Sequence, residues 1–191
     1  MKAQRETYVS VDVETAGPIP GEFSLLSIGA CAVDDAATTF SCELRPINHN
    51  ADPEALRISG LSLESLATFG LEPTEAMARF ADWAEILVDG NGKLVFVAFN
   101  APFDWSFVNY YFHRFLGRNP FGFAALDIKA YYMGVTGCAW SDTRSSRISA
   151  RLKPASEGDH SALHDALYQA ELFRLTRDLK RQIDSKSALP D

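Results

Sequence analysis

The chain has 191 residues, of which 47% are hydrophobic and 23% are charged. This length and composition fit one globular domain and exclude a disordered or fibrous protein. Its 18 Lys and Arg against 25 Asp and Glu give a net charge of −7, which excludes binding of nucleic acid through an overall positive charge. Any binding of nucleic acid therefore needs locally clustered positive charge or bound metal ions.

We expect a cytoplasmic protein that does not associate with membranes. The N-terminal residues contain no apolar signal core, and the longest apolar run, Leu94–Phe99, is far shorter than the ~20 residues that span a bilayer. Cys31, Cys42 and Cys138 are far apart and form neither a C-x-x-C pair nor a zinc-binding spacing. Such cysteines are typical of reduced thiols in the cytosol.

The first part of the chain predicts an antiparallel meander of three strands. Thr7–Glu14 alternates strictly, with its valines on one face and its acids on the other. A turn rich in Gly and Pro follows, and then the apolar strand Leu25–Val33. A turn at 34–35 leads into a third strand, Thr39–Leu44.

The rest of the chain predicts helices around one further strand. Together with the meander they predict an α/β fold, a three-layer domain with a mixed sheet, spanning 1–183 and followed by a flexible tail at 184–191. The expected elements are short helical turns at Pro53–Ile58 and Ser62–Phe69, a helix from Pro73, the strand Leu94–Ala98, a helix from Pro102 to a stop at Gly117, a helix up to Met133, loops with short helix at 134–158, and a last helix at Ala162–Gln182.

Two acids at the end of the first strand are the first candidate functional residues. Asp12 and Glu14 are two positions apart, so their side chains point the same way from backbones about 7 Å apart. Adjacent acids on one face repel each other unless something positive lies between them. A solvent-facing strand edge would also explain them, but the valines favour a central strand, so this pair indicates a metal site.

A third acid follows the strand Leu94–Ala98. Asp104 lies in the first turn of the helix predicted from Pro102. The helix dipole favours a carboxylate there, which alone would explain it. The carboxyl ends of strands are also where α/β sheets place ligands. For Asp104 taken alone, both interpretations stay open.

His160 and Asp165 form an H-x-x-x-x-D motif before the last helix. Within one helix these residues would point about 140° apart and could not share a target. Ser161 is a good N-cap, which would place His160 in the lead-in loop and Asp165 one turn inside the helix. In that arrangement both can face one site, although a surface histidine and a surface acid would also fit the pattern.

Taken together, the motifs resemble the DEDD exonuclease family, in its histidine-containing (DEDDh) subclass. The first strand carries D-x-E, the middle helix opens with N-x-x-F-D, and the last helix opens with the histidine motif. The similarity covers nearly the whole chain and extends in particular to ribonuclease T and the proofreading exonuclease subunit of DNA polymerase III. The residues that carry it are Asp12 to Gly17, Asn100, Phe103, Asp104, Asn119 to Phe121, His160 to Leu163, and Asp165.

The resemblance implies a ribonuclease H-like domain with a mixed five-stranded sheet and an active site with two metal ions. It assigns Asp12, Glu14, Asp104 and Asp165 to two Mg²⁺ or Mn²⁺ ions, which hard carboxylate oxygens prefer. Two such ions can activate water and stabilise the leaving oxygen, and they let an acidic protein hold a phosphodiester. It assigns His160 as the general base, whose ordinary pKa of ~6.5 suits this role.

The resemblance also implies contacts to the terminal nucleotide. Thr15, through its backbone, and the nearby Asn100 and Phe103 are the candidates, although core packing would also explain Phe103. The chain departs from ribonuclease T at Pro18, where that enzyme carries a stacking aromatic, and Phe99 replaces the histidine usual before Asn100. Because base stacking is worth ~1–3 kcal/mol per base, we expect end preference to differ from ribonuclease T.

We therefore expect a 3′-5′ exonuclease that releases nucleoside 5′-monophosphates from the 3′ end of single-stranded DNA or RNA. The alternatives are an oligoribonuclease-like enzyme acting on short RNA and a non-catalytic, nuclease-like binding module. The resemblance also implies a homodimer. A basic cluster from Arg144 to Lys153 precedes the last helix, where either a solvated loop or phosphate contact would explain it.

Overall fold

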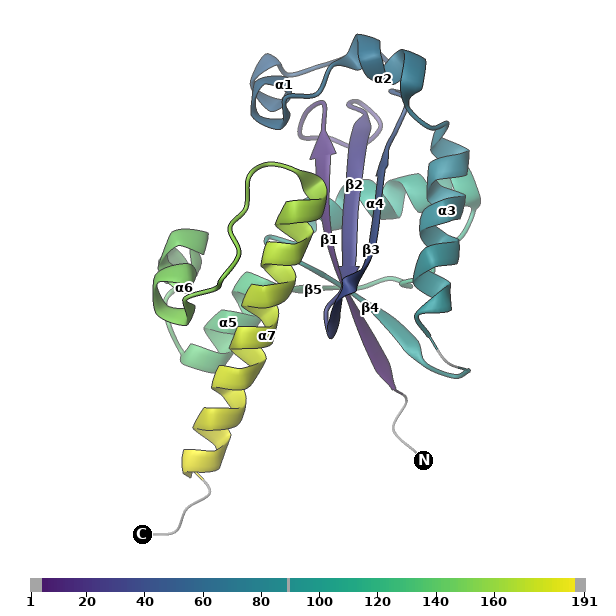
Figure 1. The fold of residues 1–191 in the computed structure, drawn as a ribbon. Helices are drawn as coiled ribbons and strands as arrows, with labels where there is room; N and C mark the ends of the chain where they lie inside the picture. Colours follow the sequence, from purple (N-terminus) through teal and green to yellow (C-terminus); the bar gives the residue numbers. More distant parts are fainter. Residues whose placement is uncertain (1–4, 89, 188–191) are drawn as a thin grey trace.

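The computed structural model describes residues 5–88 and 90–187 and confirms the predicted α/β class. A mixed five-stranded sheet in the order β3-β2-β1-β4-β5 has helices on both faces (Figure 1). The strands are β1 (Glu6–Thr15), β2 (Leu25–Ala32), β3 (Asp35–Glu43), β4 (Lys93–Ala98) and β5 (Ala125–Asp127). The helices are α1 (Pro53–Ser59), α2 (Leu63–Phe69), α3 (Pro73–Ile86), α4 (Pro102–Tyr111), the π-helical η1 (Phe112–Leu116), α5 (Ile128–Thr136), the 3₁₀ turn η2 (Trp140–Thr143), α6 (Ser145–Leu152) and α7 (Ala162–Ser187).

Strand β1 lies at the centre of the sheet. It pairs antiparallel with β2, where Asp12 is opposite Gly29, and parallel with β4, where Val9 is opposite Phe96. Strands β4 and β5 also run parallel to each other. The carboxyl ends of β1, β4 and β5 therefore meet at one edge of the sheet, where α/β folds place their ligands.

Each face of the sheet has its own hydrophobic core. On one face, Val11 of β1 packs with Phe80 of α3 and Phe107 of α4. On the other, Ile128 of α5 and Phe173 of α7 belong to a second buried cluster against β2 and β4. The valine face of β1 is thus buried under α3 and α4, and its acidic face lies under α7. Figure 1 shows these helices on either side of the sheet.

Most predicted elements are confirmed, and the differences have simple causes. Strand β3 begins at Asp35 instead of Thr39, because 33–34 form a two-residue turn and the exposed edge strand has no apolar alternation at its start. The region 134–158 contains η2 and α6, as expected of loops with short helix. Helix α7 continues past Gln182 to Ser187, so the first part of the predicted tail is helical, while 188–191 lie outside the described residues.

Within the described part of the chain, none of the helices combines the length and the apolar character needed to cross a membrane.

Candidate active site

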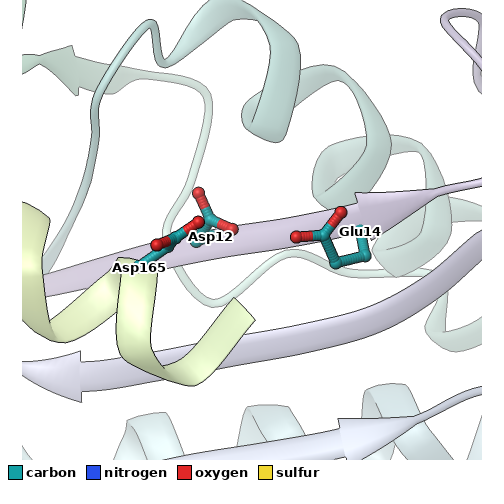
Figure 2. Close-up of side chains that lie close together, drawn as sticks. All are labelled: Asp12, Glu14 and Asp165. Atoms are coloured by element: carbon teal, nitrogen blue, oxygen red, sulfur yellow. The ribbon is translucent and has the colours of Figure 1, made fainter. Parts of the chain in front are cut away.

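Three carboxylates come together at the end of β1. Asp12 and Glu14 of β1 and Asp165 of α7 each offer an oxygen within 4.8 Å of the others. Figure 2 shows the three side chains gathered where the first turn of α7 passes over β1. The alternation of β1 places the first two acids on one face, and the packing of α7 brings the third, which is far away in the sequence.

The start of α7 is held by its own loop and by the sheet. The helix begins directly after Ser161, whose carbonyl accepts the Asp165 N–H at 2.8 Å, as the N-cap prediction required. The Asp159 N–H donates to Asp165 Oδ1 at 3.0 Å. His160 lies between Asp159 and Ser161 in the chain and has a φ of 64°. This left-handed conformation is uncommon for a residue with a side chain and often marks functional sites.

Asp104 reaches the same strand from the other face of the sheet, where α4 packs. Its side chain is 4% exposed, and Oδ1 accepts the backbone N–H of Val13, between Asp12 and Glu14, at 3.2 Å. Asp104 lies outside the group of three acids described above, but its charge acts strongly on Asp12. The first turn of α4 therefore brings the fourth predicted acid to the same strand end.

Asp127 holds the residue directly before α4, the helix that carries Asp104, a role that the sequence did not predict. Its Oδ2 accepts the Ala101 N–H at 2.7 Å, and its Oδ1 accepts the Ala130 N–H at 2.7 Å as the N-cap of α5. One carboxylate thus ties the end of β4 to the start of α5. An acid directly before an expected helix is the sequence signal for a cap, but the second contact depends on the tertiary fold.

Gln169 orients Asp12, and the motifs in the sequence did not predict this role either. Its Oε1 accepts the Phe99 N–H at 2.8 Å, so its amide nitrogen points the other way and donates to Asp12 Oδ1 at 2.5 Å. The side chain is 6% exposed. Gln169 lies one helical turn after Asp165, so both residues share the face of α7 that covers the site. That i, i+4 spacing is the signal that could have indicated it.

The four acids destabilise one another as anions. Burial, and then the charges of Asp104, Asp165 and Glu14, raise the pKa of Asp12 well above its ordinary value, although the Gln169 hydrogen bond lowers it. Burial and the charge of Asp165 raise the pKa of Glu14 to about 7. Burial raises the pKa of Asp104 to about 8 and also raises that of Asp165.

These residues fit divalent cations. Their donor atoms are hard carboxylate oxygens, which suit Mg²⁺ and Mn²⁺. Their mutual repulsion is the second indication, because buried like charges are stable as anions only when a positive charge lies among them. Since the donor set and the electrostatics agree, the acidic cluster is a candidate divalent metal centre.

An open cleft of about 890 Å³ adjoins the cluster. Asp12, Asp165 and His160 line it together with α6 and the loop that follows. His160 is exposed to solvent there, where it can meet a water molecule beside the acids. The predicted histidine and two of the predicted acids therefore share one cleft.

The three predicted nucleotide contacts differ in their surroundings. Thr15 is buried at the end of β1, and its hydroxyl donates to the Gly17 carbonyl at 2.9 Å. Asn100 is exposed at the end of β4 with φ of 67°. Phe103 packs on the core, with its ring 5.4 Å from that of Phe107, which favours a packing role.

This sheet order, with acids gathered at the end of its central strand, defines a ribonuclease H-like fold, which the nuclease domain of a DEDDh family member shares. The chain belongs to the exonuclease family, since a family model described as exonuclease matches residues 9–173.

Two relatives and two solved structures illustrate the similarity. The 3′-5′ DNA exonuclease Cap18 of Escherichia coli is 54% identical over 186 residues, which are 96% of this chain and 100% of that protein. Ribonuclease T of Escherichia coli is 32% identical over 179 residues, covering 86% of this chain and 81% of that protein. The nuclease domain of 3′hExo, a DEDDh family member, shares the fold with a TM-score of 0.73 at 16% identity, over 92% of this chain and 95% of that one. Exonuclease I of Escherichia coli in complex with an oligonucleotide shares the fold with a TM-score of 0.72 at 15% identity, over 95% of this chain and 43% of that one.

Proposed function

We propose that this protein is a two-metal-ion-dependent 3′-5′ exonuclease that hydrolyses single-stranded DNA and releases nucleoside 5′-monophosphates. The observation that carries the proposal is the convergence of Asp12, Glu14 and Asp165, two of which, Asp12 and Asp165, line one open cleft together with His160. Within the family, the 54% identity to a DNA exonuclease, over that relative's whole length, favours DNA over RNA.

In this proposal, Asp12, Glu14, Asp104 and Asp165 hold two Mg²⁺ or Mn²⁺ ions. When bound, such ions supply a Lewis acid and the positive charge that a phosphodiester needs in an acidic cleft. The exposed imidazole of His160 accepts a proton from the water that attacks phosphorus. The P–O3′ bond breaks, and the 3′ oxygen leaves with the shortened strand. General-base help of this kind typically contributes ~10²–10⁴ in rate.

The other residues of the site keep the acids in place. Gln169 holds one Asp12 oxygen and so aims that carboxylate into the cleft, and the Val13 N–H holds Asp104 at the end of the same strand. The backbone at Thr15 and the exposed Asn100 are the groups we assign to the terminal nucleotide, while Phe103 supports α4 from within the core.

A substrate panel tests the proposal. Matched single-stranded DNA and RNA, duplexes and dinucleotides, labelled at the 5′ or the 3′ end, are incubated with Mg²⁺ or Mn²⁺. We expect a ladder of shortened 5′-labelled DNA, early release of the 3′ label as mononucleotide, and no reaction with EDTA. Exclusive action on RNA dinucleotides would instead support the oligoribonuclease-like alternative.

The binding-only alternative makes a different prediction. A non-catalytic module would show neither hydrolysis nor a metal response in tryptophan fluorescence or melting temperature, whereas we expect Mn²⁺ to raise the melting temperature. The presence of all four acids and the histidine favours the enzyme.

A homodimer and a cytoplasmic location stay predictions. The first rests on the family resemblance and is tested by light scattering during size-exclusion chromatography. The second rests on the sequence and is tested by fractionation of cells.

A further inference from the structure

The segment that carries the basic cluster before α7 forms one wall of the active-site cleft, where Lys153 is the basic residue among those that line it. Residues Ser145, Ser146, Ser149 and Lys153 line the same cleft as Asp12 and Asp165. They come from one stripe of α6 and the residue that ends it, because positions three and four apart lie on one helix face. We call α6, the adjoining Arg144 and Lys153, and the neighbouring Lys129 and Trp140 the basic wall.

The part of the wall that faces the cleft offers hydrogen-bond donors opposite the acids. The Ser145 hydroxyl is paired with the Tyr168 hydroxyl at 2.9 Å, which fixes its position. Lys153 ends α6 with φ of 53° and faces the cleft, although Glu157 of the following loop also lines it. Serine hydroxyls and an ammonium group are typical partners of phosphate oxygens.

An aromatic and basic path continues the wall outside the cleft. Phe99 lines the cleft, and the ammonium of Lys129 lies 5.8 Å from the centre of its ring. The same ammonium lies 4.4 Å from the centre of the Trp140 ring. Trp140 is 52% exposed in η2, which packs against both α5 and α6. An exposed tryptophan beside a lysine provides a stacking surface for a nucleobase.

The positive charge of the wall is largely uncompensated. Among the described residues, the ion pair of this segment joins Arg147 to Asp142, and none joins Lys129, Arg144 or Lys153 to a carboxylate. In a chain with a net charge of −7, this concentration of basic side chains in and beside a segment that lines an acidic cleft is a local exception. Long-range attraction would draw a polyanion to this side of the cleft.

We propose that the basic wall binds the single strand on the 5′ side of the scissile phosphate, with Lys153 and Arg144 on phosphates and a base stacked on Trp140. This proposal rests on the proposed exonuclease function and specifies the substrate as a strand several nucleotides long. The eight residues of α6 span about 12 Å, close to the rise of three stacked nucleotides of a strand at ~3.4 Å each. The wall therefore contacts nucleotides that a dinucleotide lacks.

The test compares substrate lengths. Steady-state hydrolysis of a dinucleotide and of thymidine oligonucleotides of increasing length is measured for the wild type, Trp140→Ala and Lys153→Gln. We expect the KM for long strands to rise by about 5- to 150-fold in Trp140→Ala, the loss of one base stack, with kcat unchanged. We expect dinucleotide hydrolysis to stay at the wild-type rate in both variants.

Two further readouts separate binding from folding. Loss of one phosphate contact in Lys153→Gln lowers the slope of log affinity against log salt by about 0.7 for a single strand, measured by fluorescence anisotropy without metal. Oligonucleotide binding should quench wild-type tryptophan fluorescence, and this quenching should diminish in Trp140→Ala. The matched controls are Arg181→Gln and Phe123→Ala, which remove an exposed cation at the far end of α7 and an aromatic that is 91% exposed.

The outcomes separate the two proposals. Equal effects of the wall variants on dinucleotides and long strands, or no effect on either, would overturn the strand path while leaving the exonuclease assignment intact. The strand path would also be overturned if Arg181→Gln and Phe123→Ala impaired the hydrolysis of long strands as much as the wall variants do. No hydrolysis of any substrate by the wild type would overturn the proposed function itself.

Discussion

Substitution of Gly29 by alanine should displace the start of α7 and with it the active site. Gly29 lies in β2 directly opposite Asp12, and α7 begins on top of it. An added Cβ would lie 2.1 Å from the carbonyl carbon of Ala162 and 2.2 Å from the nitrogen of Leu163. Both atoms belong to backbone, so no side-chain rotation relieves the contact.

The size of the effect follows from these distances. An ordinary contact is at least 3.4 Å, so the first turn of α7 must move by 1.3 Å (3.4 minus 2.1 Å) or the sheet must yield by the same amount. Overpacking of this kind typically destabilises by ~1–3 kcal/mol. Asp165 and His160 flank the displaced turn, and a misplacement of about 1 Å can reduce a rate ~10²-fold. We expect kcat to fall much more than the small loss of stability would explain.

The assay pairs single-nucleotide release under saturating metal and substrate with urea unfolding of the same samples. The control is Gly134→Ala, in the last turn of α5, where an added Cβ meets nothing within 4 Å and alanine favours a helix by up to ~1 kcal/mol. We expect Gly134→Ala to keep full activity and wild-type or higher stability. A Gly29→Ala protein with wild-type kcat would show that α7 does not need this close approach to assemble the site.

Four further variants test the site. His160→Ala should lose ~10²–10⁴ in kcat but keep the melting temperature and its rise with Mn²⁺. Asp12→Asn should raise the free energy of unfolding without metal, by about 1 kcal/mol, and abolish that rise; a less stable metal-free variant would contradict the repulsion argument. Gln169→Leu leaves Asp12 and the Phe99 N–H without a partner, so it should destabilise by ~1–3 kcal/mol and weaken the apparent Mn²⁺ affinity 10- to 100-fold, roughly. The pKa of Glu14 in the folded protein is raised to about 7, so the folded state binds this proton more tightly than the unfolded state, and the free energy of unfolding without metal should fall as pH rises towards that value. In urea titrations, Glu14→Gln should remove ~1–2 kcal/mol of this pH dependence, a figure discounted for the partial exposure of Glu14.

The fold could be predicted wherever one face of an element is apolar and the other polar. The alternation of β1 and the apolar stripe of α3 follow directly from burial on one side, and their bounds were nearly right. Strand β3 was predicted too short because it lies at the edge of the sheet and buries little of its start. The three-residue β5 exists through its pairing with β4, and this pairing leaves no local pattern to read.

The supporting residues of the site could not be predicted from the sequence for a similar reason. Asp12 and Glu14 are neighbours on one strand, so their pairing could be read from the sequence alone. Gln169 contacts Asp12 across 157 positions of the chain, and Asp127 caps one helix while holding the loop before another. Gly29 within an apolar strand is a recognised signal of close backbone approach, but the partner, the start of α7, becomes known only from the packing.

The way in which the acids are held explains why metal and folding should be coupled. In the described part of the chain, the hydrogen bonds that the site acids accept come from neutral donors, which include the Val13 N–H, the Asp159 N–H and the Gln169 amide. An arginine or lysine in their place would offset the repulsion permanently and would compete with a cation for the same oxygens. Neutral donors fix the geometry but leave the charge uncompensated, so a bound cation stabilises the folded chain in proportion to its affinity. The repulsion that destabilises the metal-free protein is therefore the same property that gives the site its affinity for metal. For this reason a single Asp12→Asn change should increase the stability of the metal-free protein and abolish metal binding.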